Sequence, residues 1–93
     1  MIGQENAETL ALTALGWLAG QDDMFGDFLQ AGGLGPADVR RRAGEPEFLG
    51  AVLDFVLADD ARVLAFAAAA AVAPGTVQQA RAALPGGATV HWT

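Results

Sequence analysis

Glycine and proline interrupt this chain so often that no helix in it can be long. The interruptions stand at Gly20, Gly32, Gly44, Pro74 and Pro85-Gly86-Gly87. Glycine ends helices by adopting the left-handed conformation, and proline cannot continue a helix because it lacks a backbone N–H. Each segment between two interruptions has room for one or two helices of average length with their connections. The sequence therefore predicts a fold made of several short helices.

Six segments between these interruptions carry helical signals, and no pair of strands is visible. Polar caps at Asn6, Asp22, Asp59 and Thr76, together with apolar residues three or four apart, mark their starts and their inward faces. The predicted helices cover residues 6–19, 23–31, 36–43, 46–58, 60–72 and 77–84. Gly20 is expected to be left-handed, and Gly50 to lie on the solvent side of its helix.

The segment 61–73 sets the expected architecture. From Val63 to Gly75 it has no charged or polar side chain, and a helix that is apolar all round is normally buried. We therefore predict an all-α fold, a compact orthogonal bundle of five to six short helices around a central apolar Ala-rich helix at about 60–72. Residues 1–87 are expected to form a single helical domain, followed by a C-terminal tail at 88–93.

The charge balance bears on the class of partner. The net charge is −6, from eleven carboxylates against five arginines and no lysine. Such a surface repels the phosphates of nucleic acids and of anionic membranes. A helix over residues 63–73 would span about 17 Å, too short for a hydrocarbon core of about 30 Å. With no cysteine and no signal-like N-terminus, we expect a cytoplasmic protein that binds neither membranes nor, in the main, nucleic acid.

The missing residue types restrict the chemistry. The chain contains no Ser, Cys, Lys or Tyr and a single histidine, His91. Ser–His and Cys–His nucleophiles, Schiff bases and His/Cys zinc sites therefore have no side chains to form them. We expect no enzyme activity, no catalytic residue, no cofactor and no metal site. A weak carboxylate site for a divalent cation at Asp22, Asp23 and Asp27 is kept as an alternative, although helix capping explains these residues directly.

Two features are candidates for partner binding. Arg40, Arg41 and Arg42 form the one cationic cluster, and we take Arg40 and Arg41, together with Trp92 in the tail, as the candidate contact residues. The segments 60–72 and 77–84, joined by a tight turn, also have the outline of a helix-turn-helix. Gln78, Gln79 and Arg81 in the second segment could read base edges.

Two runs of sequence resemble a known family. They are FLQAGGLGPADVR at 28–40 and EFLGAVLDFVL at 47–57, followed by the Ala-rich segment and Pro74. Together they resemble a domain-of-unknown-function family of small all-helical alphaproteobacterial proteins, over about residues 8–84. The resemblance implies a freestanding bacterial protein that is helical throughout. It implies no activity, substrate or catalytic residue.

The expected function is that of a small non-catalytic module that binds another protein. The absence of catalytic residue types favours it, as do large apolar residues beyond the needs of a small core, Leu12 and Trp92 among them. Nucleic-acid binding through the last two helices and the carboxylate metal site are the alternatives. The residues leave the identity of the partner and the oligomeric state open.

Overall fold

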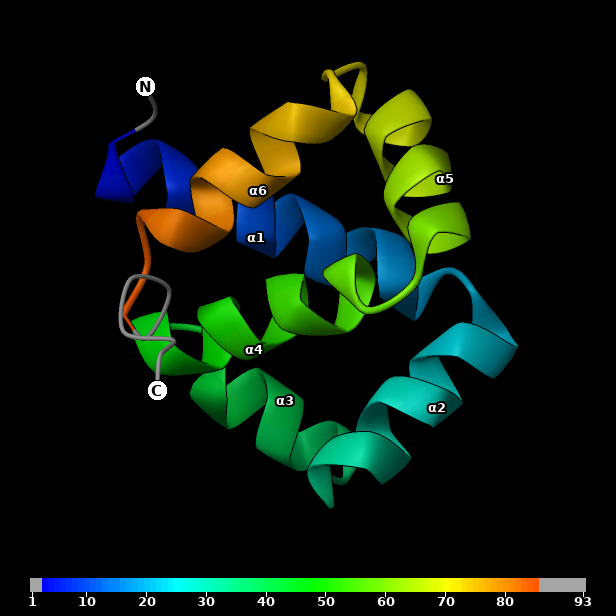
Figure 1. The fold of residues 1–93 in the computed structure, drawn as a ribbon. Coiled ribbons are helices and arrows are strands. Elements are labelled where there is room, and N and C mark those ends of the chain that lie inside the picture. Colours follow the sequence, from blue (N-terminus) through cyan, green and yellow to red (C-terminus); the bar gives the residue numbers. More distant parts are fainter. Residues whose placement is uncertain (1–2, 86–93) are drawn as a thin grey trace, which may run out of the picture.

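The computed structural model describes residues 3–85 and contains, within them, six helices and no strand (Figure 1). The helices are α1 (Gln4–Ala19), α2 (Asp22–Gly32), α3 (Pro36–Arg42), α4 (Pro46–Leu57), α5 (Asp60–Ala70) and α6 (Pro74–Ala82). The prediction of an all-α bundle of short helices is confirmed. The six predicted segments correspond to the six helices, with ends that coincide or differ by at most three residues.

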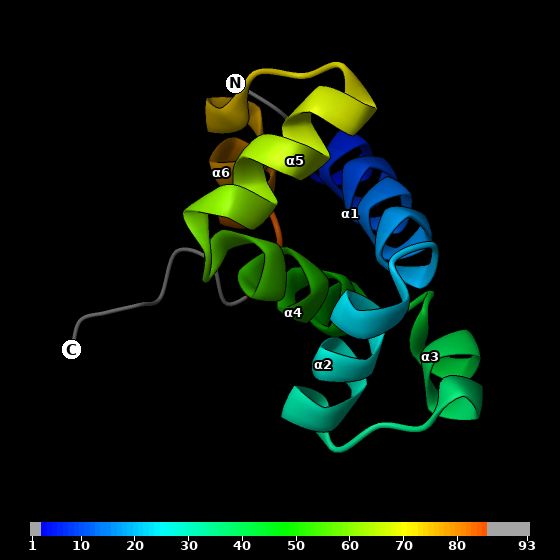
Figure 2. The ribbon, with the colours of Figure 1, turned by 90° about the vertical axis from the view of Figure 1, so that its right-hand side faces the viewer.

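The helix that buries the largest share of its residues is α4, and in this sense it is the central helix. α5 and α6 lie on one side of it while α2 and α3 lie on the other (Figures 1 and 2). The buried residues of α4 are Phe48, Leu49, Gly50, Val52, Leu53 and Val56. Six apolar or small residues in a helix of 12 residues leave a narrow polar side for solvent. The core of the molecule is therefore organised around α4.

The prediction that α5 is the central helix is wrong. Phe66 and Ala67 are its buried residues, whereas Leu64, Ala65 and Ala68 face solvent. The reason lies in side-chain size. Burying an alanine removes far less apolar surface from water than burying Phe, Leu or Val. The helices with larger side chains therefore occupy the interior. In Figure 2, α5 crosses the outside of the bundle above α4.

Close packing between helices through alanines occurs at α1. Its inward face carries Ala7, Ala11 and Ala14, all with no exposed surface, before Leu15 and Leu18. Alanines at a helix contact let the two axes approach closely, and α1 packs against α4 and α6 along this face. Trp17, near the end of the helix, is half-buried and stacks at a tilt on Phe66, with 5.5 Å between the ring centroids.

The helix starts show which capping signals operate. Asp59 caps α5 as predicted, because its Oδ1 accepts hydrogen bonds from the backbone N–H groups of Ala61 and Arg62. Thr76 is not a cap, since α6 begins two residues earlier at Pro74. Asn6 and Asp22 lie inside their helices instead of preceding them. Proline at the first helical position starts α6 without a polar cap because its fixed φ already suits the helix.

Two glycines differ from their predicted roles. Gly20 ends α1 with φ −86°, in the right-handed region, whereas Gly33 after α2 is left-handed with φ 64°. Gly50, expected on the solvent side of α4, is buried because the Arg81 side chain from α6 covers it. A Cβ at Gly50 would lie 2.9 Å from Nη1 of Arg81. That contact joins residues far apart in sequence and is invisible to a helical wheel.

Ala71 ends α5 in a conformation that favours glycine. Its φ is 59°, and the N–H of Val72 donates to the carbonyl of Ala67 in a left-handed helix ending. Left-handed strain costs alanine about 1–2 kcal/mol, while glycine adds about 0.4–1 kcal/mol of unfolded-state entropy. We expect Ala71→Gly to raise the free energy of unfolding by about 0.5–1 kcal/mol in urea titrations. Gly33→Ala should lower it by a similar amount, and equal signs for the two changes would contradict the assignment.

Candidate interaction surface

The outward side of α5 is apolar and exposed to solvent. Within residues 3–85 two large hydrophobic side chains are exposed to solvent. Leu64 on α5 is 60% exposed, and Leu12 on α1 is 46% exposed. Ala61, Ala65 and Ala68 are exposed around Leu64. We call this set of four residues, 61, 64, 65 and 68, the α5 face. A surface helix normally turns a polar side to water, so the α5 face is the unusual feature of this molecule.

Two hollows border the α5 face, one on each side. The first, of about 340 Å³, lies between α5 and α6, and its walls include Leu57, Val63, Leu64, Pro74 and Gln78. The second, of about 420 Å³, lies between α5 and α2, and its walls include Asp23, Met24, Asp27, Asp59, Ala61 and Ala65. A ridge of small side chains between two hollows is a shape to which another protein surface can be complementary.

The hollow on the α2 side has an acidic rim. Asp23 and Asp27 come from α2 and Asp59 from the start of α5, and Asp60 lines the opposite hollow. None of these four carboxylates takes part in an ion pair within residues 3–85. Arg62 also lines the α2-side hollow, but its guanidinium is held over the Phe55 ring, 4.0 Å from the centroid, and donates to the Phe55 carbonyl at 2.8 Å.

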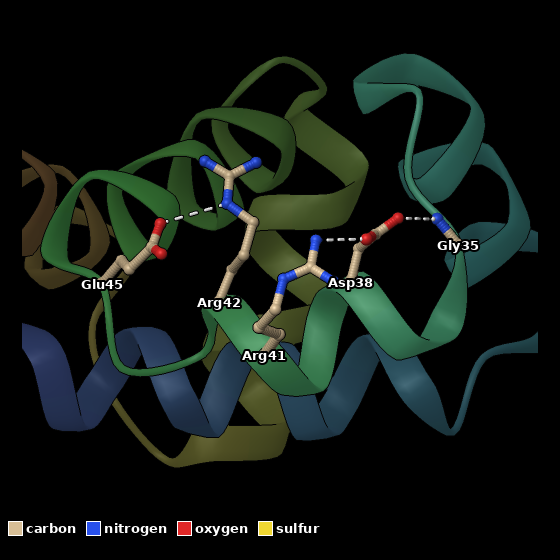
Figure 3. Close-up of polar contacts among 5 residues, drawn as sticks. All are labelled: Gly35, Asp38, Arg41, Arg42 and Glu45. Atoms are coloured by element: carbon tan, nitrogen blue, oxygen red, sulfur yellow. Dashed lines mark hydrogen bonds and ion pairs between the residues drawn. The ribbon is translucent and has the colours of Figure 1, made fainter.

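The arginine cluster of α3 is divided among local contacts (Figure 3). Arg41 donates to Asp38 at 2.6 Å, and Arg42 donates to Glu45 at 3.1 Å while lying over the Phe48 ring. Arg40 is exposed and forms no ion pair within the described part of the chain. Arg41 and Arg42 are thus held by two different carboxylates. Binding of a partner by Arg40 and Arg41 stays a prediction, and Trp92 lies outside the described residues.

The start of α3 depends on the ionised carboxylate of Asp38. Its Oδ2 accepts the backbone N–H of Gly35 at 2.8 Å, and its Oδ1 accepts from Arg41 (Figure 3). The Gly35 hydrogen bond first, and the Arg41 contact second, lower the pKa of this carboxyl below its ordinary value of 3.8. Both contacts favour the charged form because each places a donor against the negative oxygen atoms.

This lowered pKa predicts how Asp38 contributes to stability. A group whose pKa is lower in the folded state stabilises the fold fully above its unfolded pKa of 3.8 and loses that contribution as the pH falls through the folded value. Urea titrations of the wild type and Asp38→Asn should therefore differ at pH 7, with the wild type more stable, and converge below pH 3.8. A difference that stayed constant with pH would show that the charge is irrelevant.

The helix-turn-helix outline of α5 and α6 is present, but Arg81 has another role. The two helices bend by 100° at their break. Arg81 on α6 makes two bonds to Asp54 on α4, at 2.6 and 3.1 Å, and one to the Pro85 carbonyl at 3.0 Å. Its side chain is 16% exposed. Gln78 and Gln79 face solvent, so the residues predicted to read base edges are not presented together.

Within residues 3–85 no group of three His, Cys, Asp or Glu side chains lies close enough together to hold a metal ion, Asp22, Asp23 and Asp27 included. In the same range no single helix has the length and apolar character needed to span a bilayer, while α5 and α6 together have both but are bent at their break.

The α5 face was missed by sequence reasoning although a signal for it existed. On a helical wheel Val63, Phe66 and Ala70 fall within about 60° of one another, and Leu64 lies about 100–160° away from them, among alanines. The side that carries Val63 and Phe66, the one aromatic residue of the helix, indicates the inward face. The uniform apolar composition of the segment hid this asymmetry, because every position counted as hydrophobic.

Comparison with known proteins assigns the chain to a family. No curated protein and no solved structure matches it. Residues 4–87 match a family described as "Protein of unknown function (DUF3572)". The resemblance predicted over about 8–84 is confirmed by this match, which includes the α5 face and both hollows. The chain therefore belongs to the DUF3572 family of proteins of unknown function.

Proposed function

We propose that this protein is a small interaction module that uses the α5 face to bind an amphipathic helix of a different protein. The observation that carries the proposal is the exposure of Leu64 at 60% on a helix whose outward side holds no polar residue from Ala61 to Ala68 apart from Arg62 at its flank. Contiguous exposed apolar surface marks interaction sites on monomeric proteins, and Leu64 is contiguous on α5 with the exposed residues Ala61, Ala65 and Ala68.

The small side chains of the α5 face favour a helix as the bound element. Helix axes pack 8–10 Å apart, at the short end when small residues meet at the contact. Ala61, Ala65 and Ala68 supply such a surface, and Leu64 projects from it as a single large side chain. The two bordering hollows can receive larger side chains of the partner. A helix of 11 residues is about 16 Å long, enough for about three turns of contact.

Charge disfavours a second copy of this chain as the bound partner. A symmetric dimer through the α5 face would bring together the same surface from both copies. Asp59 and Asp60 stand at the start of that face, and Asp23 and Asp27 stand beside it. With a net charge of −6 on each copy, the two surfaces would repel one another. A different protein does not carry this penalty.

Site-specific photo-crosslinking tests the proposal. A benzophenone amino acid is placed at Leu64 or, as a control, at Leu12, the other large exposed apolar residue within 3–85. The labelled proteins are irradiated in cells of the source organism. We expect one discrete adduct from position 64 that is absent from position 12 and that competes with unlabelled wild type. Equal adducts from both positions, or none from position 64, would refute the docking role of α5.

The oligomeric state provides a second, independent test. Light scattering should report a monomer for both the wild type and Leu64→Glu, and circular dichroism should show that the variant is folded, because Leu64 contributes little to the core. A dimer that Leu64→Glu dissociates would mean that the α5 face pairs two copies of the chain, contrary to the proposal.

A further inference from the structure

We infer that the helix bound by the α5 face is cationic, with Lys or Arg along the edge that lies over α2. This inference rests on the proposed function and specifies the partner's chemistry. It is drawn from the carboxylates that surround the face: Asp23 and Asp27 on α2, and Asp59 and Asp60 at the start of α5. None of the four has an ion-pair partner within residues 3–85.

Asp27 is the most informative of these carboxylates. Asp22 and Asp23 lie in the first turn of α2, and Asp59 caps α5, so each has a favourable place at a helix start. Asp27 lies in the middle of α2, is exposed, and lines the hollow beside α5. Neither capping nor the helix dipole explains a carboxylate at that position. Its place on the wall of the hollow lets it meet a cation that approaches α5 from that side.

Arg62, the one cationic side chain that lines this hollow, already interacts with Phe55 on α4. Arg62 is stacked on the Phe55 ring, 4.0 Å from the centroid, and its Nη1 donates to the Phe55 carbonyl at 2.8 Å. These contacts turn its charge toward α4 and hold the start of α5 in place. The acidic rim therefore lacks an internal counter-charge, and a bound cation would meet carboxylates from two helices.

The floor of the hollow suits the stems of long basic side chains. Met24 and the alanines Ala61 and Ala65 line the hollow together with the carboxylates and give it apolar walls. Lys and Arg bury their methylene stems along such walls while keeping the charged group at the polar rim. Methionine adapts its shape to different side chains. Apolar floor and acidic rim together favour a basic amphipathic helix over a neutral one.

Three synthetic peptides of 18 residues test this inference. They share one leucine face, and their polar face carries Lys, Gln or Glu; a scrambled Lys peptide without a leucine face controls for charge alone. Binding to the full chain is followed by fluorescence anisotropy. We expect the Lys peptide to bind at least tenfold more tightly than the Gln peptide, and the Glu and scrambled peptides not to bind. Raising the salt from 50 to 500 mM should remove most of the Lys advantage, because screening shortens the reach of the charges.

Matched variants locate the effect. The double variant Asp23→Asn/Asp27→Asn should lower the affinity for the Lys peptide about tenfold and leave the affinity for the Gln peptide unchanged. Glu5→Gln/Glu47→Gln removes the same charge from the first turns of α1 and α4, at the opposite end of the bundle from α5 (Figure 1), and should change neither. Leu64→Glu should abolish binding of both peptides. Equal weakening by the two double variants would overturn the assignment of the rim.

The outcomes separate this inference from the function on which it rests. Lys and Gln peptides that bind equally, and are both lost with Leu64→Glu, would overturn the cationic partner and leave the docking face standing. Binding of any peptide that is insensitive to Leu64→Glu would overturn both. Uptake on neutral phosphatidylcholine vesicles that Leu64→Glu abolishes, without peptide binding, would show that the α5 face binds a lipid surface and would also overturn both.

Discussion

Replacement of Phe66 by alanine is expected to lower the free energy of unfolding by about 3–5 kcal/mol, the usual cost of truncating a buried phenylalanine. Phe66 has no exposed surface and packs its ring against Trp17 at 5.5 Å between centroids. It holds α5 on the bundle together with Ala67. The loss would take a large part of the about 5–15 kcal/mol that stabilises a typical domain. Urea denaturation followed by circular dichroism measures it.

Leu64, two residues earlier on the same helix, is the matched control. Its side chain is 60% exposed, so Leu64→Ala should change the free energy of unfolding by no more than about 0.5 kcal/mol. The difference between the losses in Phe66→Ala and Leu64→Ala measures how much more the inward side of α5 is buried than its outward side. Similar losses for the two variants would mean that α5 is enclosed on both sides. In that case the α5 face, and with it the proposed docking site, would not exist.

Replacement of Phe28 by alanine is expected to release α2 from the bundle and to cost about 3–5 kcal/mol. Phe28 is 4% exposed and is the residue through which α2 enters the core. Its ring centroid lies 6.0 Å from that of Phe48 and 5.4 Å from that of Phe55, and both contacts are edge-on. Aromatic pairs in this arrangement stabilise the fold beyond the burial of their apolar area. Hydrogen exchange should show lost protection across α2 before the rest of the protein.

The control for α2 is Phe25→Ala, at a half-buried position one turn earlier. It should cost clearly less than Phe28→Ala and leave the exchange of α2 nearly intact. Loss of α2 would also remove Asp23 and Asp27 from the side of α5. Phe28→Ala should therefore weaken the Lys peptide more than the Gln peptide. Uniform loss of protection in all six helices would contradict a local role for Phe28.

The predicted helix positions were nearly right because their signals are local. Pro36, Pro46 and Asp59 mark helix starts through contacts within a few residues. Where a signal competed with a neighbour, the prediction failed. Thr76 could have capped a helix, but Pro74, two residues earlier, started it first. Ala71 ends α5 in the left-handed region although no glycine stands there, because Val72 turns back to pack on the core.

The candidate surface is harder to predict from sequence than the helices are. Cationic and aromatic residues are common in interfaces, and on that ground the sequence favours Arg40, Arg41 and Trp92, a prediction that stays open. Arg41 instead holds Asp38 at the start of α3. The surface proposed here consists of Leu64 and three alanines, residue types that carry no specific binding signal in a sequence. Its recognition depends on knowing which side of α5 is covered, and that is a property of the neighbouring helices.

The all-α class, the places of the helices and the net negative charge follow from residue types and from spacings of one to four residues, so they can be predicted before any contact is known. That α4 is central and α5 peripheral depends on contacts between distant segments and appears only in the folded molecule. The same is true of the covering of Gly50 by Arg81, which pairs with Asp54 across 27 residues. Several helices here are apolar enough to be central. Which one is buried depends on how much apolar surface each can remove from water against the others, and no single segment contains that comparison.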